Sequence, residues 1–596
     1  MLCAGSAFAS GSAPDCAPAT LNNSALLDGT VTVSPQPGSR DATPQTQISF
    51  LGVGAAELSR VRVSGSLSGA HPGRLLAYSQ GDGASFLPAR AFREGETVTV
   101  SASLRSGAAV RGMLDRFVIA QQDPLSSTPE PTHAGSAAEI QSFRSRPDLH
   151  PPTVAVTTQS AAVAAGEIFL APYNGPGQSG PMVLDSSGGL IWFKPLPSGT
   201  SATNFQVQQY GGRPVLTWWQ GSITVHGFGL GEDRIANGSY TEIGRVRAGN
   251  GLRADLHEFQ LTPAGTALIS AYEPIYCNLS ANGGPRHGAV TDALMQEIDP
   301  KTGLVMFQWT SVDHVAMSES YASAAASTTG LPFDFFHLNS IDLAPDGSLL
   351  ISARNTWGVY DLNSSSGQVQ WRLGGKRSSF AMAPGSATAW QHDARELPNG
   401  TISMFDNGAS PKVHGQSRGV VVSLNAQNHS AALLSQFERP SPLLADSQGN
   451  LQSLANGDWF LGWGQIPDFS ELDGAGKLIF DAHLPPLDQS YRDFRFQWTG
   501  TPVHPPAFSL APGAGGGGEV FASWNGATQV ASWRVLAGPT RTALTPVAEL
   551  PRSGFETAIA LSPATPGPYL SVQALNGAGA VIGTGAPSTR AAAAAR

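Results

Sequence analysis

Three histidines lie at matching positions of a sequence pattern that recurs along this chain. Each one precedes a turn glycine by eight to ten residues, where the strand before that turn would begin. A lone histidine at a strand end is usually structural, but the same position in several repeats predicts that the imidazoles converge. The histidine and glycine pairs are His257 with Gly265, His337 with Gly347, and His392 with Gly400.

An arginine joins this group through one of the same predicted hairpins. Arg354 lies seven residues after Gly347, at the far end of the returning strand. The open ends of an antiparallel hairpin are neighbours, so Arg354 and His337 are predicted to share one face. Asn339, two residues after His337, would face the same side of a strand. Asn407 has in its own repeat the place that Arg354 has in the preceding one.

Neutral imidazoles beside a permanent cation suit an anion with delocalised oxygens. Arginine forms paired hydrogen bonds with sulfate or phosphate, and an imidazole held through its other nitrogen can act as a nucleophile. Further imidazoles can protonate a leaving oxygen. Three histidines could also hold zinc, but Arg354 would repel that cation. Tyr272 and Trp219, seven residues after their turn glycines, could line an aromatic-accepting mouth, although such residues more commonly pack between blades.

The turn glycines belong to a repeat that covers residues 152–505. A glycine followed by a hydrophobic strand occurs six times, at intervals of 46 to 82 residues. A second strand pair often follows, and two hairpins in each repeat make one four-stranded propeller blade. Six copies predict a six-bladed β-propeller, and a solenoid is the alternative. The glycines are Gly166, Gly212, Gly265, Gly347, Gly400 and Gly457.

The rest of the chain is predicted to form two small β-sandwiches, which makes the fold class all-β. Short alternating strands over residues 28–122 and 519–590 resemble immunoglobulin or fibronectin modules. A polar, proline-rich linker is predicted over 123–151 and a glycine-rich linker over 506–518. The longest interval between turn glycines contains an insertion at 273–336, which is interpreted either as a lid or as a solvated loop.

Composition and charge narrow the function classes. The 596-residue chain has a net charge of -9 with only 13% charged residues, which argues against a nucleic-acid-binding face. No apolar run approaches the length of a membrane span. Residues 1–27 are interpreted as a leader. Its Ala7-x-Ala9 pattern resembles the tail of a secretory signal, so export to the periplasm or cell exterior is expected.

The cysteines predict no disulfide framework. The chain has only three of them, Cys3, Cys16 and Cys277, and the predicted propeller contains one. A bridge between Cys3 and Cys16 within the leader is one interpretation, and an unstructured leader with free thiols is the other.

At the histidine-bearing segments the sequence resembles the bacterial arylsulfotransferases that do not use the nucleotide sulfate donor, and in particular their less characterised second branch. The resemblance implies an exported six-bladed propeller with its site at the central channel. The best-known members carry a disulfide near their site, and this propeller sequence lacks a second cysteine for one. The matching motifs, within residues 257–408, are HEFQLTPAG, FHLNSIDLAPDGSLLISARNT, WRLGGK and QHDARELPNGTISMFDNG.

The resemblance also implies a reaction and residue roles. A sulfuryl group would pass from an aryl sulfate to a phenolic acceptor by a ping-pong route. His392 would be the nucleophile that becomes sulfated. His257, His337 and Arg354 would bind the sulfuryl oxygens with help from Asn339, and one histidine would carry the proton. No metal and no organic cofactor is implied.

Other functions stay open at this point. A non-enzymatic exported propeller would use the histidines as a structural cluster or as a passive anion site. A hydrolase of aryl sulfates or phosphates could use the same residues. A quinone-type dehydrogenase, also a propeller, would need a calcium site and a ring of tryptophans, whereas the tryptophans here are scattered. The sequence specifies neither the physiological substrates nor the oligomeric state.

Overall fold

The computed structural model contains mostly short antiparallel β-sheets, so the predicted all-β class is confirmed. The described residues divide into two compact units. Unit 1 comprises Met1–Thr128, Val246–Ile402 and Val422–Leu434, and unit 2 comprises Pro129–Arg245, Ser403–Val421 and Ser435–Arg596. The structure describes residues 13–16, 18–19, 31–106, 109–124, 127–327, 331–513 and 517–595.

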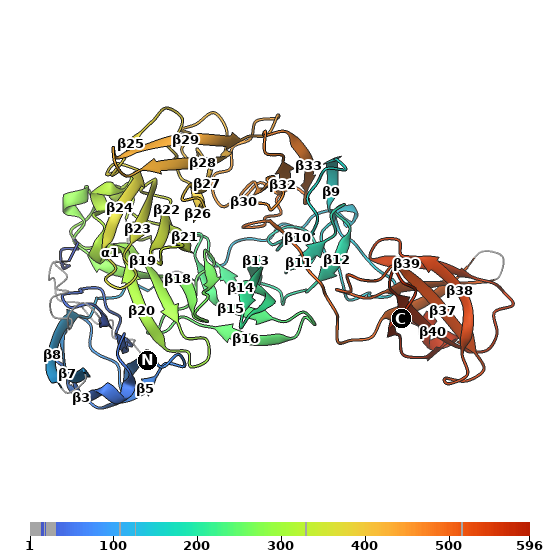
Figure 1. Cartoon of the computed structure of the whole chain (residues 1–596), viewed down its shortest axis with the longest axis horizontal. Coiled ribbons are helices and arrows are strands. Elements are labelled where there is room, and N and C mark those ends of the chain that lie inside the picture. Colours follow the sequence, from blue (N-terminus) through green and yellow to red (C-terminus); the bar gives the residue numbers. More distant parts are fainter. Residues whose placement is uncertain are drawn as a thin grey trace, which may run out of the picture. The chain divides into compact units, whose positions relative to one another are not determined.

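Unit 1 contains two four-stranded sheets whose strands follow each other in chain order (Figure 1). A third repeat begins with β26 (His392–Glu396), whose turn leads into β27 (Ile402–Asp406). The first sheet comprises β17 (Phe259–Leu261), β18 (Ala267–Cys277), β19 (Gly288–Ile298) and β20 (Val305–Thr310). The second comprises β21 (Leu338–Leu343), β22 (Leu349–Ala353), β23 (Gly358–Leu362) and β24 (Val369–Gly374).

The first hairpin of each of these repeats turns at one of the glycines found in the sequence. Gly265, Gly347 and Gly400 have φ angles of 81°, 88° and 76°. A Cβ atom added at any of the three would meet no atom within 4 Å. The left-handed backbone, and not lack of space, therefore requires glycine at these turns.

Side chains join the first strands of the three repeats to one another. Alternate side chains of one first strand accept hydrogen bonds from the backbone N–H groups of the next first strand. These bonds fix the register of neighbouring repeats, so that the strand ends carrying the histidines are held in line. The pairs are Glu258 with Ile341 (3.2 Å), Gln260 with Leu343 (3.0 Å), Ser340 with Ala394 (3.0 Å) and Asp342 with Glu396 (2.9 Å).

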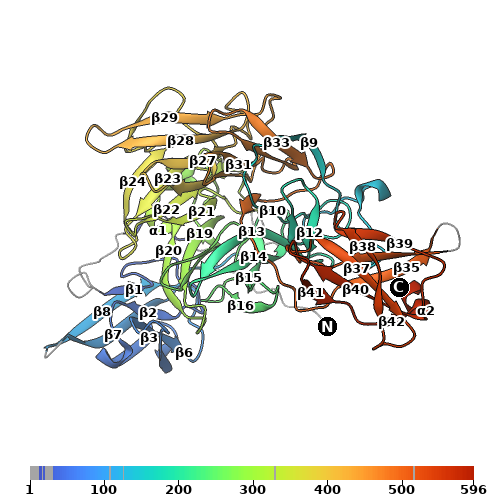
Figure 2. The ribbon, with the colours of Figure 1, turned by 45° about the vertical axis from the view of Figure 1, so that its right-hand side comes forward.

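Two further sheets of unit 1, formed by the early part of the sequence, enclose one apolar core (Figure 2). The hydroxyls of Ser49, Tyr78 and Ser85 all donate to the carbonyl of Val305, so this module covers the edge strand β20. One sheet comprises β1 (Thr32–Ser34), β2 (Ile48–Leu51), β6 (Gly83–Pro88) and β5 (Gly73–Ala77), and the other β4 (Gly69–His71), β3 (Leu58–Gly65), β7 (Thr97–Ser106) and β8 (Ala109–Val118).

Unit 2 contains three sheets of the repeat region. Strand β34, near the end of that region, pairs with β10 near its beginning, and β33 pairs with β9. The sheets are β34 (Phe494–Phe496) with β10 (Glu167–Leu170), β11 (Met182–Leu184) and β12 (Leu190–Phe193); β13 (Ser201–Tyr210), β14 (Arg213–Ile223), β15 (Gly229–Ala236) and β16 (Glu242–Val246); and β30 (Asn450–Ser453), β31 (Trp459–Gly462), β32 (Asp468–Leu472), β33 (Leu478–His483) and β9 (Ala155–Gln159).

The C-terminal part of unit 2 forms two sheets around its own core. The side chain of Asn525 accepts from the Phe193 N–H and donates to the Phe193 carbonyl, both at 2.9 Å, and so caps the edge strand β12. The sheets are β35 (Ala507–Pro512), β36 (Gly518–Ser523) and β39 (Glu556–Leu561), and β38 (Thr545–Pro551), β37 (Ser532–Gly538), β40 (Tyr569–Leu575) and β41 (Val581–Thr584) with β42 (Ser588–Thr589).

One predicted linker is corrected by these sheets. Residues 507–512, which the sequence places in a glycine-rich linker, form β35 and pair with β36 up to Gly518. Phe508 and Leu510 pack on the C-terminal core, which explains why this segment is a strand. In the predicted linker 123–151, the described residues include a 3-10 helix and an isolated bridge between Ile140 and Pro152.

The remaining elements are short. Strand β25 (Ala381–Met382) pairs in parallel with residues of β29 (Ser430–Phe437), and β28 (Arg418–Asn425) precedes β29 in the chain. The helices of the described residues are α1 (Ser311–His314), α2 (Arg590–Ala594), and the 3-10 helices η3 (Ala55–Glu57), η4 (Ala137–Glu139), η5 (Ser280–Asn282), η6 (Met317–Glu319) and η7 (Ala324–Ala326).

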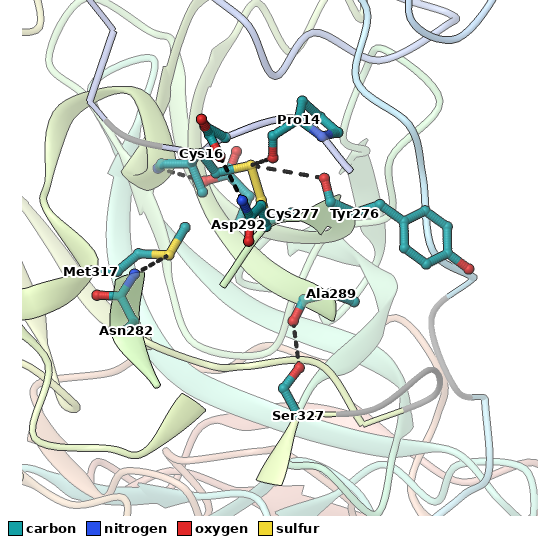
Figure 3. The surroundings of a disulfide bond; sticks show 12 residues. Pro14, Cys16, Tyr276, Cys277, Asn282, Ala289, Asp292, Met317 and Ser327 are labelled. Carbon is teal, nitrogen blue, oxygen red and sulfur yellow. Dashed lines mark hydrogen bonds between the residues drawn. A yellow bond between two sulfur atoms is a disulfide. The ribbon is translucent and has the colours of Figure 1, made fainter. Parts of the chain in front are cut away.

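A disulfide joins Cys16 to Cys277 (Figure 3), which corrects the sequence interpretation of the cysteines. Cys16 pairs with the end of β18, and Cys3 lies outside the described residues, as does most of the predicted leader. The Asn278 N–H donates to the Pro14 carbonyl at 2.9 Å, and the Asn278 side chain donates to Asp15. Residues 13–16 are therefore fastened to unit 1. The partners are 261 residues apart, so spacing in the sequence gave no signal for the bridge.

The Cys16–Cys277 pairing predicts the number of free thiols and a contribution to the free energy of unfolding. Unfolded, unreduced protein should expose one thiol, and peptide mapping should link Cys16 to Cys277. Cys277→Ser should lower the free energy of unfolding by about 2–4 kcal/mol, because a long loop is no longer closed in the unfolded chain. Cys3→Ser should retain the cross-linked peptide. A Cys3–Cys16 peptide in oxidised protein would contradict this pairing.

A buried carboxyl in the N-terminal module predicts a pH-dependent stability. Asp115 lies on the core side of β8 between Met113 and Phe117, and burial raises its pKa to about 7. The unfolded chain then binds fewer protons, so stability should fall as pH rises from about 4 to 7. Asp115→Asn, whose side chain does not ionise, should remove up to about 4 kcal/mol of this pH-dependent loss in the free energy of unfolding. Calorimetric melting at a series of pH values tests this prediction, and Asp82→Asn, at an exposed position, is the control. If stability depends on pH equally in both variants, Asp115 is not its cause.

Candidate functional site

The structure places all three histidines at the beginning of a first strand. His257 and His337 lie just before β17 and β21, and His392 is the first residue of β26. Arg354 follows the last residue of β22, and its backbone N–H donates to the His337 carbonyl at 2.9 Å. His337 and Arg354 are therefore neighbours at the open end of one hairpin, as the sequence predicted.

Each imidazole is held through its Nδ1 atom. Nδ1 of His257 contacts the carboxylate of Asp255, and Nδ1 of His337 contacts that of Asp334. Nδ1 of His392 contacts the backbone carbonyl of Trp390 at 3.1 Å, which requires a proton on that nitrogen. The contacts direct ring chemistry to Nε2 in all three cases. They also differ, because a carboxylate carries a charge that can balance a positive ring whereas a carbonyl carries none.

Two of the imidazoles lie against each other. The ring centroids of His257 and His337 are 4.8 Å apart with an interplanar angle of 87°. The ring of Tyr272 lies 5.6 Å from His257 and 6.0 Å from His337, and its hydroxyl donates to the Leu338 carbonyl. Tyr272 thus packs behind the pair of rings, with its hydroxyl used by the backbone.

Arg354 and His392 are linked through Trp390. The Arg354 guanidinium carbon lies 4.8 Å from the centre of the Trp390 ring, and its Nη1 donates to the Asn355 side chain at 2.9 Å. The carbonyl of the same Trp390 holds His392. Side-chain and backbone contacts therefore link His257, His337, Arg354, Trp390 and His392 in one contiguous group in unit 1.

The backbone at this site is strained. His337, Trp357, Trp390 and Asp393 have φ angles of 55°, 53°, 59° and 55°, in the left-handed region that residues other than glycine rarely adopt. Such residues cost about 1–3 kcal/mol each and persist where surrounding contacts impose them, as at functional sites. Four of them beside the same imidazoles support a functional interpretation of the cluster.

A buried ion cluster holds the strands that carry His257 and His392. Arg395 of β26 donates to Glu258 at 2.6 Å, to Asp393 at 2.7 Å and to the Ile341 carbonyl at 2.8 Å. Burial lowers the pKa of Arg395, but Glu258, Asp393 and Asp342 outweigh it and raise that pKa. Glu258 and Asp393 are the chain neighbours of the two histidines, so this cluster fixes the backbone beside both rings.

Three other predicted site residues have their side chains occupied elsewhere. Asn339 is fully buried and donates to the Gln391 carbonyl at 2.7 Å, one residue before His392. It does not continue an alternation from His337, because His337 has left-handed φ and precedes the strand. Asn407 and Trp219 belong to unit 2. Asn407 donates to the backbone, and Trp219 is fully buried.

Sequence reasoning missed the residues that orient the rings. Asp255 and Asp334 lie two and three residues before their histidines, and this spacing is the signal that could have found them. Trp390 gave no such signal, because its backbone oxygen makes the contact. The described part of the chain contains no group of three metal-ligating side chains placed to hold a metal ion. Its helices are also too short or too polar to span a bilayer.

A comparison with known families agrees with the site. Residues 206–484, which include all four cationic residues, match the family described as Arylsulfotransferase (ASST). This region of the chain belongs to the arylsulfotransferase family. Among curated proteins, none matches the chain.

Solved structures resemble this chain only weakly. A protein of unknown function from Bacteroides caccae is 15% identical, with a TM-score of 0.31 over 55% of this chain and 98% of its own. Virginiamycin B lyase from Staphylococcus aureus is 8% identical, with a TM-score of 0.28 over 60% and 94%. An auxiliary nutrient binding protein from Bacteroides ovatus is 9% identical, with 0.26 over 82% and 94%. Likenesses at this level say nothing about this chain's function.

The ion cluster predicts a large stability loss on removal of its cation. Arg395→Met should destabilise the arylsulfotransferase region by about 3–5 kcal/mol, because Glu258 and Asp393 would remain buried without it. Arg534→Met removes a pair with the exposed Glu549 and should cost at most about 1 kcal/mol. Denaturant unfolding of both variants measures the difference. Equal losses would show that the cluster does not hold these strands.

Proposed function

We propose that the repeat sheets form a six-bladed β-propeller, with immunoglobulin-like modules at residues 28–122 and in the C-terminal part of the chain. The pairing of β34 with β10 supports this, because a blade that contains strands from both ends of the repeat region would tie a propeller ring closed. The left-handed glycines that recur in the turns of successive first hairpins support it too.

We propose that this arylsulfotransferase moves a sulfuryl group from an aryl sulfate to a phenol through a sulfated His392. The observation that carries the proposal is the arrangement of the rings. Three imidazoles are each held through Nδ1, and Arg354 lies at the open end of the hairpin that carries His337, inside the region that matches the family. His392 is the imidazole held by a neutral carbonyl, which suits a neutral nucleophile.

In the first half-reaction, His392 Nε2 attacks the sulfur of the aryl sulfate. A nitrogen–sulfur bond forms while the bond from sulfur to the aryl oxygen breaks. Arg354 donates to the sulfuryl oxygens, whose charge it balances in the transition state. The departing aryl oxygen takes a proton from Nε2 of His257 or His337, and the Asp255 and Asp334 carboxylates sustain that proton exchange.

The second half-reaction reverses these bonds with a different phenol. The acceptor hydroxyl gives its proton to the same carboxylate-backed imidazole and attacks sulfur, and the nitrogen–sulfur bond to His392 breaks. The enzyme returns to its starting protonation, so no metal, oxidant or organic cofactor enters the balance. Asn339 supports the nucleophile indirectly, because it holds the peptide before His392.

Export is part of this proposal. The Cys16–Cys277 disulfide supports it, since such bonds persist in oxidising compartments. Small aryl sulfates and phenols are the proposed partners, and the flanking modules cover sheet edges rather than contribute to the reaction.

Turnover of 4-nitrophenyl sulfate with a series of phenols tests the reaction. Nitrophenol release should require a phenol, and His392→Ala should lower kcat/KM at least about 1,000-fold, because His257 and His337 are held by carboxylates and would not replace the nucleophile. Asp255→Asn and Asp334→Asn should each cost about 10- to 100-fold. The exposed His150→Ala is the control and should retain full activity.

Other outcomes assign other functions. Release without dependence on a phenol would indicate a hydrolase, and preference for 4-nitrophenyl phosphate would indicate phosphoryl transfer. No release with any donor, in protein that still binds aryl sulfate, would favour the exported binding module.

A further inference from the structure

Trp390 makes two contacts that reach different functional groups. Its ring faces the Arg354 guanidinium at 4.8 Å, and its carbonyl holds Nδ1 of His392 at 3.1 Å. Trp390 is buried and has a φ of 59°. One residue therefore contacts the arginine through its ring and the imidazole two residues later through its carbonyl.

A second tryptophan and a tyrosine lie behind Trp390. The edge of the Trp357 ring system meets Trp390 at 5.1 Å and 74°. Trp357 is stacked on Tyr321 at 3.5 Å and 6°, and Trp357 also has left-handed φ. Tyr321 belongs to the insertion between β20 and β21, so an aromatic ladder connects that insertion to Trp390.

The insertion segment that provides Tyr321 is itself fastened to the second sheet. Lys376 lies 4.8 Å over the Tyr321 ring and donates to the Ser320 carbonyl. Glu319 accepts from Arg372 Nε at 3.1 Å and from the Tyr360 hydroxyl at 3.2 Å. Trp357 and Lys376 thus both contact the Tyr321 ring, so the ladder is positioned to support Trp390.

Through these contacts Trp390 can orient two groups, the Arg354 guanidinium and the His392 imidazole. An arginine side chain has several rotatable bonds, and a cation–π contact restricts where its guanidinium lies. A backbone carbonyl fixes both the tautomer and the tilt of an imidazole. Because both contacts come from Trp390, the position of the anion-binding group and that of the nucleophile depend on the same residue.

We propose that Trp390 is a positioning residue that orients Arg354 toward the sulfuryl group held by His392, and that Trp357 and Tyr321 hold Trp390 in place. This inference rests on the proposed sulfuryl transfer. Trp390 touches neither sulfur nor aryl oxygen in this scheme, and it acts through Arg354. The insertion then serves as a support for the site, and its effect on catalysis should pass through the arginine.

A double-mutant cycle between Trp390 and Arg354 tests the inference with the full-length chain and 4-nitrophenyl sulfate. Trp390→Leu removes the aromatic face but keeps the carbonyl, and it should lower kcat/KM about 3- to 30-fold. Trp390→Phe keeps an aromatic face and should stay within about 3-fold of the wild type. In an Arg354→Ala background the Trp390→Leu change should have almost no further effect.

Further variants keep the test falsifiable where Trp390→Leu folds poorly. Tyr321→Leu changes a residue that is 38% exposed, and it should give a smaller loss that also disappears in the Arg354→Ala background. Trp371→Ala is the control. Trp371 belongs to the outer strand β24 and its ring packs on Phe380, so the activity of this variant should match that of the wild type. Thermal melting of each variant separates lost activity from unfolding.

The two proposals fail in different ways. Additive losses from the Trp390 and Arg354 changes, with active wild-type protein, would overturn the positioning role and leave sulfuryl transfer intact. Equal losses in Trp390→Phe and Trp390→Leu would overturn it as well, because the aromatic face would then be irrelevant. Wild-type protein that transfers no sulfuryl group would instead overturn the proposed function on which the inference rests.

Discussion

The proposed chemistry depends on one type of interaction, the contact that occupies Nδ1 of each histidine. A mobile imidazole exchanges tautomers and presents either nitrogen, whereas these three rings are each fixed by a neighbour along the chain. The partners are not equivalent. Carboxylates stand behind His257 and His337, and a peptide carbonyl stands behind His392. This difference gives a physical basis for separating a neutral nucleophile from groups that exchange protons, which three identical histidines in a sequence do not provide.

The rings keep their places because the backbone around them is held from several sides. Glu258, just before β17, and Ser340 in β21 accept N–H groups of the following first strand, and Arg395 binds the carboxylates beside two of the histidines. Strained left-handed residues lie within this frame. Their conformational cost is consistent with a site whose geometry is imposed by surrounding contacts. The flanking modules cover the edge strands β20 and β12.

Much of this arrangement could be read from the sequence, because it repeats. A turn glycine with left-handed φ and a histidine at a fixed distance before it marked the first strands, and hairpin geometry placed Arg354 beside His337. What failed depended on contacts that have no periodicity. The Cys16–Cys277 bridge joins distant segments, and β35 lay hidden beside a run of glycines. Asn339 was expected to face the site from strand alternation, but His337 precedes the strand with left-handed φ and breaks that alternation. The role of Trp390 comes from its backbone, which a residue type does not reveal.

The most direct test of the account is to find the sulfuryl group on the enzyme. Protein incubated with 4-nitrophenyl sulfate in the absence of a phenol should be quenched in alkali, which preserves nitrogen–sulfur bonds, and mapped by peptide mass. One sulfo group is expected on the peptide that contains His392, and it should disappear when a phenol is added. Nitrophenol release with no adduct, or with the adduct on His257 or His337, would contradict His392 as the nucleophile.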